Sequence, residues 1–191
     1  MQNRSSRIQN GRGVVEDFYN SFPFPADPLL KEPPLGYNWR WCIDASYAFC
    51  TGASFSKKNK KEGVRILDAG CGSGVSTDYL AHLNPAANIL AIDISLGALN
   101  VACQRLRLSG GDHIAKVDFE HQSLLELGEE EGLFDYINSV GVLHHLESPL
   151  NGLKSLADAL KPCSLLHLFL YSDAGRLDIQ RAQRALKILG I

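Results

Sequence analysis

Val64-Arg65-Ile66-Leu67-Asp68-Ala69-Gly70-Cys71-Gly72-Ser73-Gly74 is the stretch of sequence that decides the fold. A short apolar run ends in an acidic residue, and glycines follow at alternate positions. This pattern predicts a buried strand that leads into a tight turn. Glycine adopts positive φ and lets a ligand approach the backbone closely. If a helix follows, its free N–H groups face whatever lies over the turn, and Asp68 supplies a carboxylate beside it.

Composition is that of an ordinary globular protein with one sizeable core. The chain has 191 residues, 45% hydrophobic and 21% charged, with a net charge of −2. This balance gives no signal for nucleic-acid binding, and the basic run at residues 57–61 fits a solvated linker. No stretch is apolar enough to span a membrane, and the polar first twelve residues do not resemble a signal peptide. The five scattered cysteines lack metal-ligand spacing, so we expect reduced thiols and a cytoplasmic protein.

The first third of the chain differs from the rest. We expect residues 1–13 to be frayed, a short helix over 14–20 and a further helix over 37–50, with proline-rich breaks between them. A Ser/Lys/Gly-rich linker follows at residues 51–63. We therefore predict a helical, aromatic N-terminal cap and linker over residues 1–60 and a core over residues 61–191.

Strand and helix patterns alternate along the core. Strands are predicted at residues 64–69, 88–93, 114–119, 134–142 and 164–171, and helices at residues 74–83, 96–108, 150–160 and 177–189. Pro162 is expected to stop the third of these helices. Such alternation predicts an α/β fold, with a three-layer, doubly wound, mostly parallel sheet. Right-handed crossovers then place the carboxyl ends of the strands along one edge, where ligands of such sheets bind.

Two classes of nucleotide cofactor use a glycine turn of this kind. Dinucleotides require GxGxxG and an acid about twenty residues further on. Here Val75 occupies the position of the last glycine, so the dinucleotide pattern is not met. Asp93 ends the second strand at a suitable distance, and a carboxylate accepts hydrogen bonds from both hydroxyls of any ribose.

The ordered motifs resemble those of the class I, Rossmann-like S-adenosylmethionine-dependent methyltransferases. Residues 66–74 are similar to the first motif of that family, 92–95 to its second and 134–146 to its fourth, and the likeness covers 64–171. The resemblance implies methyl transfer from S-adenosyl-L-methionine to an acceptor, a small molecule or a protein, that the sequence does not identify. Two other functions stay open: an inactive or regulatory S-adenosylmethionine-binding module, and an NAD-type oxidoreductase domain.

The resemblance also implies a set of cofactor-binding residues. Asp68 and the backbone of the glycine turn would hold the amino-acid end of the cofactor, Asp93 its ribose and Ile94 its adenine. Ser123 stands where the family usually has an acid that meets the adenine amino group, and Val140 replaces a frequently polar residue. The full set is Asp68, Ala69, Gly70, Cys71, Gly72, Asp93, Ile94, Ser123, Leu124 and Ser139.

The catalytic residues are not identified by the sequence. Methyl transfer depends mainly on alignment, and a general base is needed only if the acceptor arrives protonated. Candidates near the expected cleft mouth are Tyr19, Tyr37, Arg40, His144 and Tyr171. Adjacent histidines point in different directions and no metal-ligand spacing accompanies His144-His145, so we predict no metal site.

Three further features have two interpretations each. Cys71 is either a small residue that fits the turn or a nucleophile. The block of residues 22–41 is either a packing cap or a lid, with Trp39 and Trp41 stacking over the ligand. The chain ends after a helix, whereas the family fold continues with two more strands, so we expect a piece of a longer protein with an exposed sheet edge.

Overall fold

The computed structural model describes residues 5–53, 63–127, 133–172 and 174–190, with side chains from residue 13 onward. The elements, in chain order, are α1 (Ser5–Ser21), η1 (Trp39–Trp41), α2 (Ile43–Thr51), β1 (Arg65–Ala69), α3 (Val75–Leu83), β2 (Asn88–Asp93), α4 (Leu96–Ser109), η3 (Gly111–His113), β3 (Lys116–His121), η4 (Leu124–Glu126), β4 (Phe134–Val140), η5 (Leu143–His145), α5 (Pro149–Ala159), β5 (Leu160–Phe169), η6 (Ala174–Arg176) and α6 (Leu177–Ile188).

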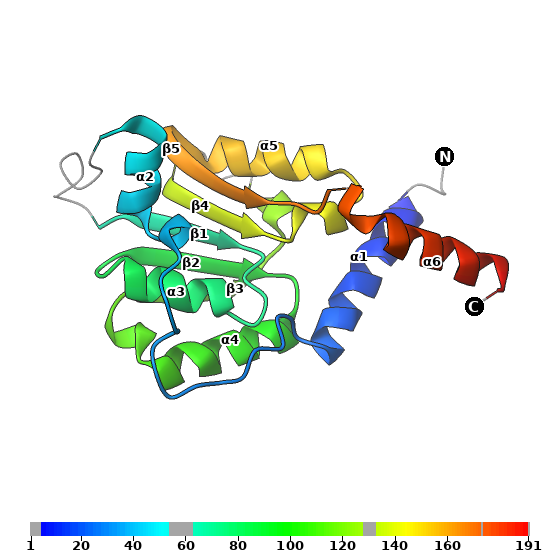
Figure 1. The fold of residues 1–191 in the computed structure, drawn as a ribbon, viewed down its shortest axis with the longest axis horizontal. Helices are drawn as coiled ribbons and strands as arrows, with labels where there is room; N and C mark the ends of the chain where they lie inside the picture. The colour runs from blue at the N-terminus through cyan, green and yellow to red at the C-terminus, as the bar shows by residue number, and fades with distance from the viewer. Residues whose placement is uncertain (1–4, 54–62, 128–132, 173, 191) are drawn as a thin grey trace.

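Five strands form one parallel sheet in the order β3-β2-β1-β4-β5. Helices α3 and α4 cover one face and α5 covers the other, as Figure 1 shows. The predicted three-layer, doubly wound α/β fold is therefore confirmed. The strand order reverses between β1 and β4, and at this point the carboxyl ends of a doubly wound sheet leave a crevice for a ligand.

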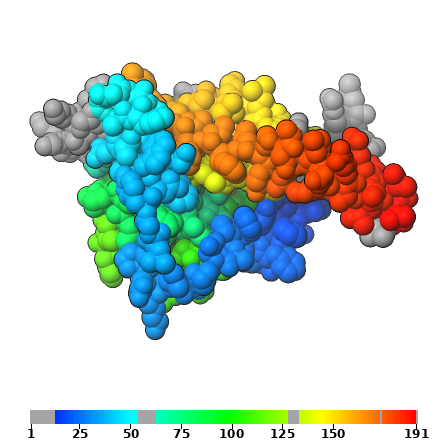
Figure 2. Space-filling model, in the orientation of Figure 1, coloured from blue at the N-terminus to red at the C-terminus, as the bar shows by residue number. Residues whose placement is uncertain are grey.

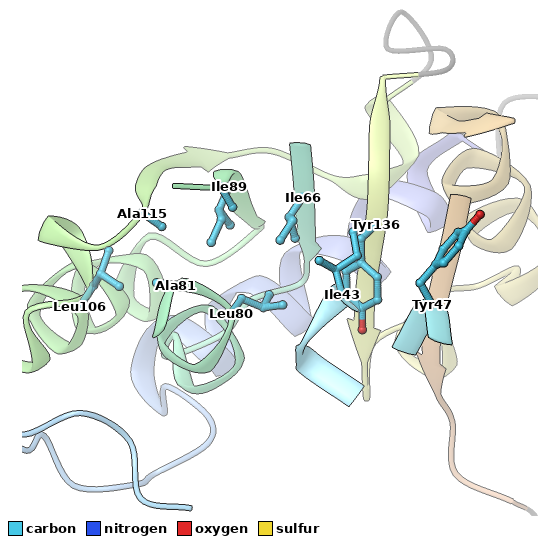
Figure 3. Close-up of a cluster of buried hydrophobic side chains, with 10 residues drawn as sticks. Ile43, Tyr47, Ile66, Leu80, Ala81, Ile89, Leu106, Ala115 and Tyr136 are labelled. Atoms are coloured by element: carbon cyan, nitrogen blue, oxygen red, sulfur yellow. The ribbon is translucent and has the colours of Figure 1, made fainter. Parts of the chain in front are cut away.

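Two apolar layers hold the sheet between its helices. On the α3 and α4 side, Ile66, Ile89 and Tyr136 of the sheet pack with Leu80 of α3 and Ile43 of α2 (Figure 3). The opposite layer joins side chains of β1, β2 and β4 to α5, η4 and η5. Strands buried on both faces read as continuous apolar runs, which is why β1 and β2 could be recognised in the sequence.

The N-terminal segment packs directly on the core. Figure 1 places α1 beyond the carboxyl ends of the strands, and Figure 2 shows the chain that follows it, blue to cyan, crossing the visible face. The buried side chain of Arg105 in α4 donates hydrogen bonds to the carbonyl oxygens of Asp27, Pro28 and Ser73, at 2.8, 2.9 and 3.0 Å. This one guanidinium thus joins the segment to the glycine turn.

Two predicted element boundaries differ from the structure, and a predicted domain boundary lies outside the described residues. Helix α1 begins at Ser5 rather than at residue 14, so the expectation of a frayed start is wrong from Ser5 onward. Strand β5 begins at Leu160, directly after α5, and contains Pro162. The ladder is irregular there, with Cys163 at φ 62°, and an edge position tolerates the missing N–H of proline. The predicted domain boundary near residue 60 lies outside the described residues.

Helix α6 differs from the other helices of the core. It follows β5 and extends away from the sheet in Figure 1, and none of its residues is buried. Among the described helices, none has both the length and the apolar character that a membrane span requires.

Candidate functional site

A large cavity of about 850 Å³ opens at the carboxyl ends of the strands. It lies where the sequence placed the ligand, over the glycine turn and the ends of β2 and β4, and α1 closes part of its side. Its wall is mainly apolar. Of the ten residues predicted to hold a cofactor, seven line this cavity: Gly70, Cys71, Gly72, Asp93, Ile94, Ser123 and Leu124.

The glycine turn adopts the backbone conformation that its sequence predicts. Gly70, Gly72 and Gly74 have φ of 79°, 53° and 81°, a region that residues with a side chain avoid. The close approach at Gly72, however, is made by the protein itself. A Cβ there would overlap the carbonyl oxygen of Phe24, which accepts a hydrogen bond from Ser73 N at 3.0 Å. The glycine therefore makes room for the N-terminal segment as well as for a ligand.

Asp93 presents a carboxylate at the cavity wall. Its Oδ2 accepts a hydrogen bond from Gly72 N and its Oδ1 from Ser95 N, both at 2.9 Å. Burial raises the pKa of this carboxyl, while the backbone hydrogen bonds oppose the shift. Each oxygen has a second lone pair, so the group can still accept hydrogen bonds from two neighbouring hydroxyls.

Asp68 lies beneath the glycine turn, and among the described residues it is not part of the cavity wall. Its Oδ2 accepts from Ser76 and Thr77 at 2.8 and 2.6 Å, and its Oδ1 accepts from Asn138 Nδ2 at 2.7 Å. Asn138 in turn accepts from Trp41 Nε1 at 3.1 Å. Complete burial raises the pKa of Asp68 despite these donors. In the structure this carboxylate joins the end of β1 to α3 and β4, and its contact with a cofactor stays a prediction.

The remaining predicted residues divide between wall and interior. Ile94 and Leu124 present apolar surface to the cavity. Ser123 lines it too, but its hydroxyl accepts from Leu125 N at 3.3 Å and caps η4. Ala69 and Ser139 are fully buried and lie outside the described wall, and no hydrogen-bond partner of the Ser139 hydroxyl is found in the described chain.

The candidate bases fall into two groups, those that line the cavity and those that do not. Tyr19 and Tyr171 line the cavity, whereas Tyr37, Arg40 and His144 are not among the described wall residues. Tyr37 is 63% exposed, and the guanidinium of Arg40 lies over the ring of Trp39 at 4.7 Å.

His145, Phe24 and Phe169 line the wall, although the sequence did not assign any of them individually to the site. Trp41 of the predicted lid also lines it, whereas Trp39 packs against Phe49 with ring centroids 4.8 Å apart. The pair His144-His145 was visible in the sequence, but no periodicity shows which of the two rings in the short helix η5 faces a ligand.

Nucleophilic catalysis by the thiol of Cys71 is disfavoured by its surroundings. Burial raises the pKa of this thiol well above its usual value, and the negative charges of Asp68 and Asp93 add to the shift. The thiol therefore stays protonated, and a protonated thiol is a poor nucleophile. Within the described residues, no group of three or more His, Cys, Asp or Glu side chains could hold a metal ion.

Comparison with known proteins identifies the family of the chain. The sequence pattern of a methyltransferase domain family matches residues 67–166. An uncharacterised protein of Synechococcus sp. is 50% identical over 92% of this chain, and the ubiquinone biosynthesis O-methyltransferase of Xanthomonas campestris is 35% identical over 56% of it. The chain spans 41% and 42% of the lengths of these two relatives.

A solved structure extends the comparison to the fold. The carbon methyltransferase CurJ superposes with a TM-score of 0.52 at 20% identity, over 66% of this chain and 33% of its own. Because the identity is low, this match shows a likeness of fold alone. Together, the family match over residues 67–166, the parallel sheet and the ordered motifs show that the chain belongs to the methyltransferase domain family.

Proposed function

We propose that the chain is the cofactor-binding part of an S-adenosylmethionine-dependent methyltransferase and that S-adenosylmethionine occupies the 850 Å³ cavity. The observation that carries the proposal is the position of Asp93. Its carboxylate lies at the end of β2 and accepts hydrogen bonds from Gly72 N and Ser95 N. The same carboxylate lines the cavity together with the glycine turn.

The volume of the cavity and the charge of its wall both fit this cofactor. A cavity of about 850 Å³ falls within the range of small-molecule sites, about 300–1,000 Å³. The charged side chains of its described wall are Asp93, Glu126 and Glu147, all acidic. An acidic wall favours a ligand with a positively charged sulfonium, because opposite charges attract strongly where water is excluded.

Each part of the site has a separate task in binding. Asp93 would accept hydrogen bonds from the ribose hydroxyls, and Ile94 and Leu124 would pack against the adenine. The backbone of Gly70 and Gly72 would lie along the amino-acid end. When bound, the cofactor supplies an activated methyl group, so the main catalytic task of the chain is to align an acceptor with it.

The acceptor is proposed to be a small molecule. The O-methyltransferase of ubiquinone biosynthesis is among the relatives, and the apolar wall suits a compact ligand.

All five cysteines carry free thiols, which supports a reducing, cytoplasmic location.

The experiment that tests this proposal is a calorimetric titration of the full-length protein with S-adenosylhomocysteine. The substitution Asp93→Ala should weaken binding by about 1–3 kcal/mol, because it leaves the ribose hydroxyls without their partner. Asp118→Ala is the matched control, since Asp118 lies on the neighbouring strand β3 and its side chain is 60% exposed. Equal affinity of the wild type and the Asp93 variant would show that the ribose lies elsewhere.

A further inference from the structure

Two side chains that are 126 residues apart in the sequence meet in the cavity wall. Tyr19 comes from α1 and His145 from η5. The Tyr19 hydroxyl lies 3.1 Å from His145 Nε2, and the two rings meet edge to face with centroids 5.8 Å apart. This contact depends on the position of α1 across the carboxyl ends of the strands (Figure 1). A tyrosine bonded to a histidine at a ligand cavity is an arrangement that can transfer a proton.

The surroundings set the protonation states of both groups. Burial lowers the pKa of His145, and the positive charge of Arg176 lowers it further. Burial raises the pKa of Tyr19, and Tyr171 and Asp93 add to that shift, while Arg176 opposes it. At neutral pH the imidazole is therefore uncharged and the phenol keeps its proton. With the imidazole proton on Nδ1, Nε2 accepts a hydrogen bond from the Tyr19 hydroxyl.

The other titratable groups around His145 belong to several elements. His144 precedes it in η5, with ring centroids 4.2 Å apart, and Tyr171 lies beyond the end of β5, with its ring 4.3 Å from that of His144. Arg176 of η6 lies 3.6 Å over the Tyr171 ring. Glu147 also lines the cavity. Both ring nitrogens of His144 are buried without a hydrogen-bond partner in the described chain, so His144 is not the group that exchanges protons with a ligand.

The chemistry of the wall indicates what kind of acceptor this pair would serve. Beside Tyr19 and His145, the wall presents the aromatic rings of Phe24, Phe169 and Tyr171. No lysine or arginine is among the wall residues that the structure describes. An uncharged aromatic ring would pack favourably against these side chains.

We propose that Tyr19 and His145 form a proton relay that accepts the proton of a phenolic acceptor, an inference that rests on the proposed methyltransferase function. The acceptor hydroxyl donates to Tyr19 Oη, and Tyr19 donates to His145 Nε2. As the acceptor oxygen bonds to the methyl carbon, the carbon–sulfur bond breaks and its electron pair stays on sulfur. The phenolic proton passes to Tyr19 while the proton of Tyr19 passes to His145. The positive charge that leaves the sulfonium is thereby regained on the imidazolium, so total charge is unchanged.

The test uses the full-length protein with two phenols of similar shape and different acidity, 4-ethylphenol and 4-nitrophenol. Release of S-adenosylhomocysteine is measured for the wild type, His145→Gln and Tyr19→Phe. His113→Gln is the matched control, because the His113 side chain is 87% exposed and lies outside the described cavity wall. Affinity for S-adenosylhomocysteine is measured on the same proteins. The pH dependence of the rate with 4-ethylphenol is measured for the wild type and for His145→Gln.

We expect both relay variants to lose about 10²–10⁴-fold in rate with 4-ethylphenol, the range typical of general base catalysis. With 4-nitrophenol the loss should stay below about tenfold, since this acceptor ionises without help. The wild-type rate with 4-ethylphenol should fall as the pH drops through the pKa of His145, because a protonated imidazole accepts no further proton, and this fall should be absent from His145→Gln. Affinity for S-adenosylhomocysteine should stay within about twofold, because neither residue is assigned to the cofactor.

The proposal is overturned if the two phenols lose rate equally, if the wild-type rate with 4-ethylphenol falls with decreasing pH no more than that of His145→Gln, or if the wild type methylates neither phenol. In each of these cases binding of S-adenosylhomocysteine would leave the proposed function intact. Absence of that binding in the wild type would instead overturn the proposed function, and the relay with it.

Discussion

At Gly72 the missing side chain makes room for a backbone carbonyl of the N-terminal segment. The residue has φ 53°, and a Cβ would overlap the oxygen of Phe24. Gly110, which ends α4, has φ 79° but no atom within 4 Å of the position of a Cβ. Alanine substitutions at the two glycines therefore distinguish two free-energy costs. One is the cost of placing a side chain on left-handed backbone, and the other is the cost of displacing a neighbouring atom.

Gly72→Ala should lower the free energy of unfolding by about 3 kcal/mol, through backbone strain and displacement of the Phe24 carbonyl. Gly110→Ala should cost about 1 kcal/mol, from the backbone alone. Urea unfolding followed by tryptophan fluorescence measures both values. Equal losses would mean that the contact between Gly72 and Phe24 contributes nothing.

His144 has two buried ring nitrogens without a hydrogen-bond partner in the described chain, and burial lowers its pKa. A lowered pKa means that the unfolded chain binds a proton more readily, so this group reduces stability as the pH falls below 6.5. His144→Phe should therefore leave stability at about pH 7.5 unchanged or up to about 1 kcal/mol higher. Its loss of stability between about pH 7 and about pH 5 should be smaller than that of the wild type. Paired urea titrations at these pH values would contradict the account if the variant were less stable at both.

Among the elements of the core, α4 is one of those that hold the N-terminal segment. Arg105 donates three hydrogen bonds to backbone carbonyls, and Asn20 Oδ1 accepts from Ser95 Oγ and Gly97 N at the start of α4, at 2.9 and 3.0 Å. These contacts keep α1 and Phe24 in the cavity wall. The shape of the site thus depends on bonds between elements that are far apart in the sequence.

Arg105→Met should lower the free energy of unfolding by about 3 kcal/mol, because buried carbonyls lose a charged donor. Limited proteolysis should also cut residues 22–35 sooner than in the wild type. Arg107→Met is the control, since Arg107 belongs to the same helix and is exposed. Wild-type protection of residues 22–35 in the Arg105 variant would show that other contacts suffice to hold the segment.

Local patterns explain what could be predicted from the sequence. The apolar runs of β1 and β2, the glycines of the turn and the acid at residue 93 are local signals, and each predicted the element or position that the structure contains. The contact between Tyr19 and His145 and the approach of Phe24 to Gly72 join distant parts of the chain, and no periodicity encodes them. Strand β5 was misjudged at its start because an edge strand tolerates Pro162.

At the scale of the whole molecule, the five-stranded sheet and its helices create one large cavity at the strand ends, and the N-terminal segment completes its wall. The same parallel sheet also serves dinucleotide enzymes, so the fold alone does not determine the cofactor. Val75 in place of a glycine, the acidic wall and the match to a methyltransferase domain together favour a sulfonium cofactor.

The identity of the cofactor is tested by a pair of calorimetric titrations of the full-length wild-type protein, one with S-adenosylhomocysteine and one with NAD. We expect one S-adenosylhomocysteine to bind per chain and no measurable binding of NAD. Tight binding of NAD without binding of S-adenosylhomocysteine would contradict this expectation.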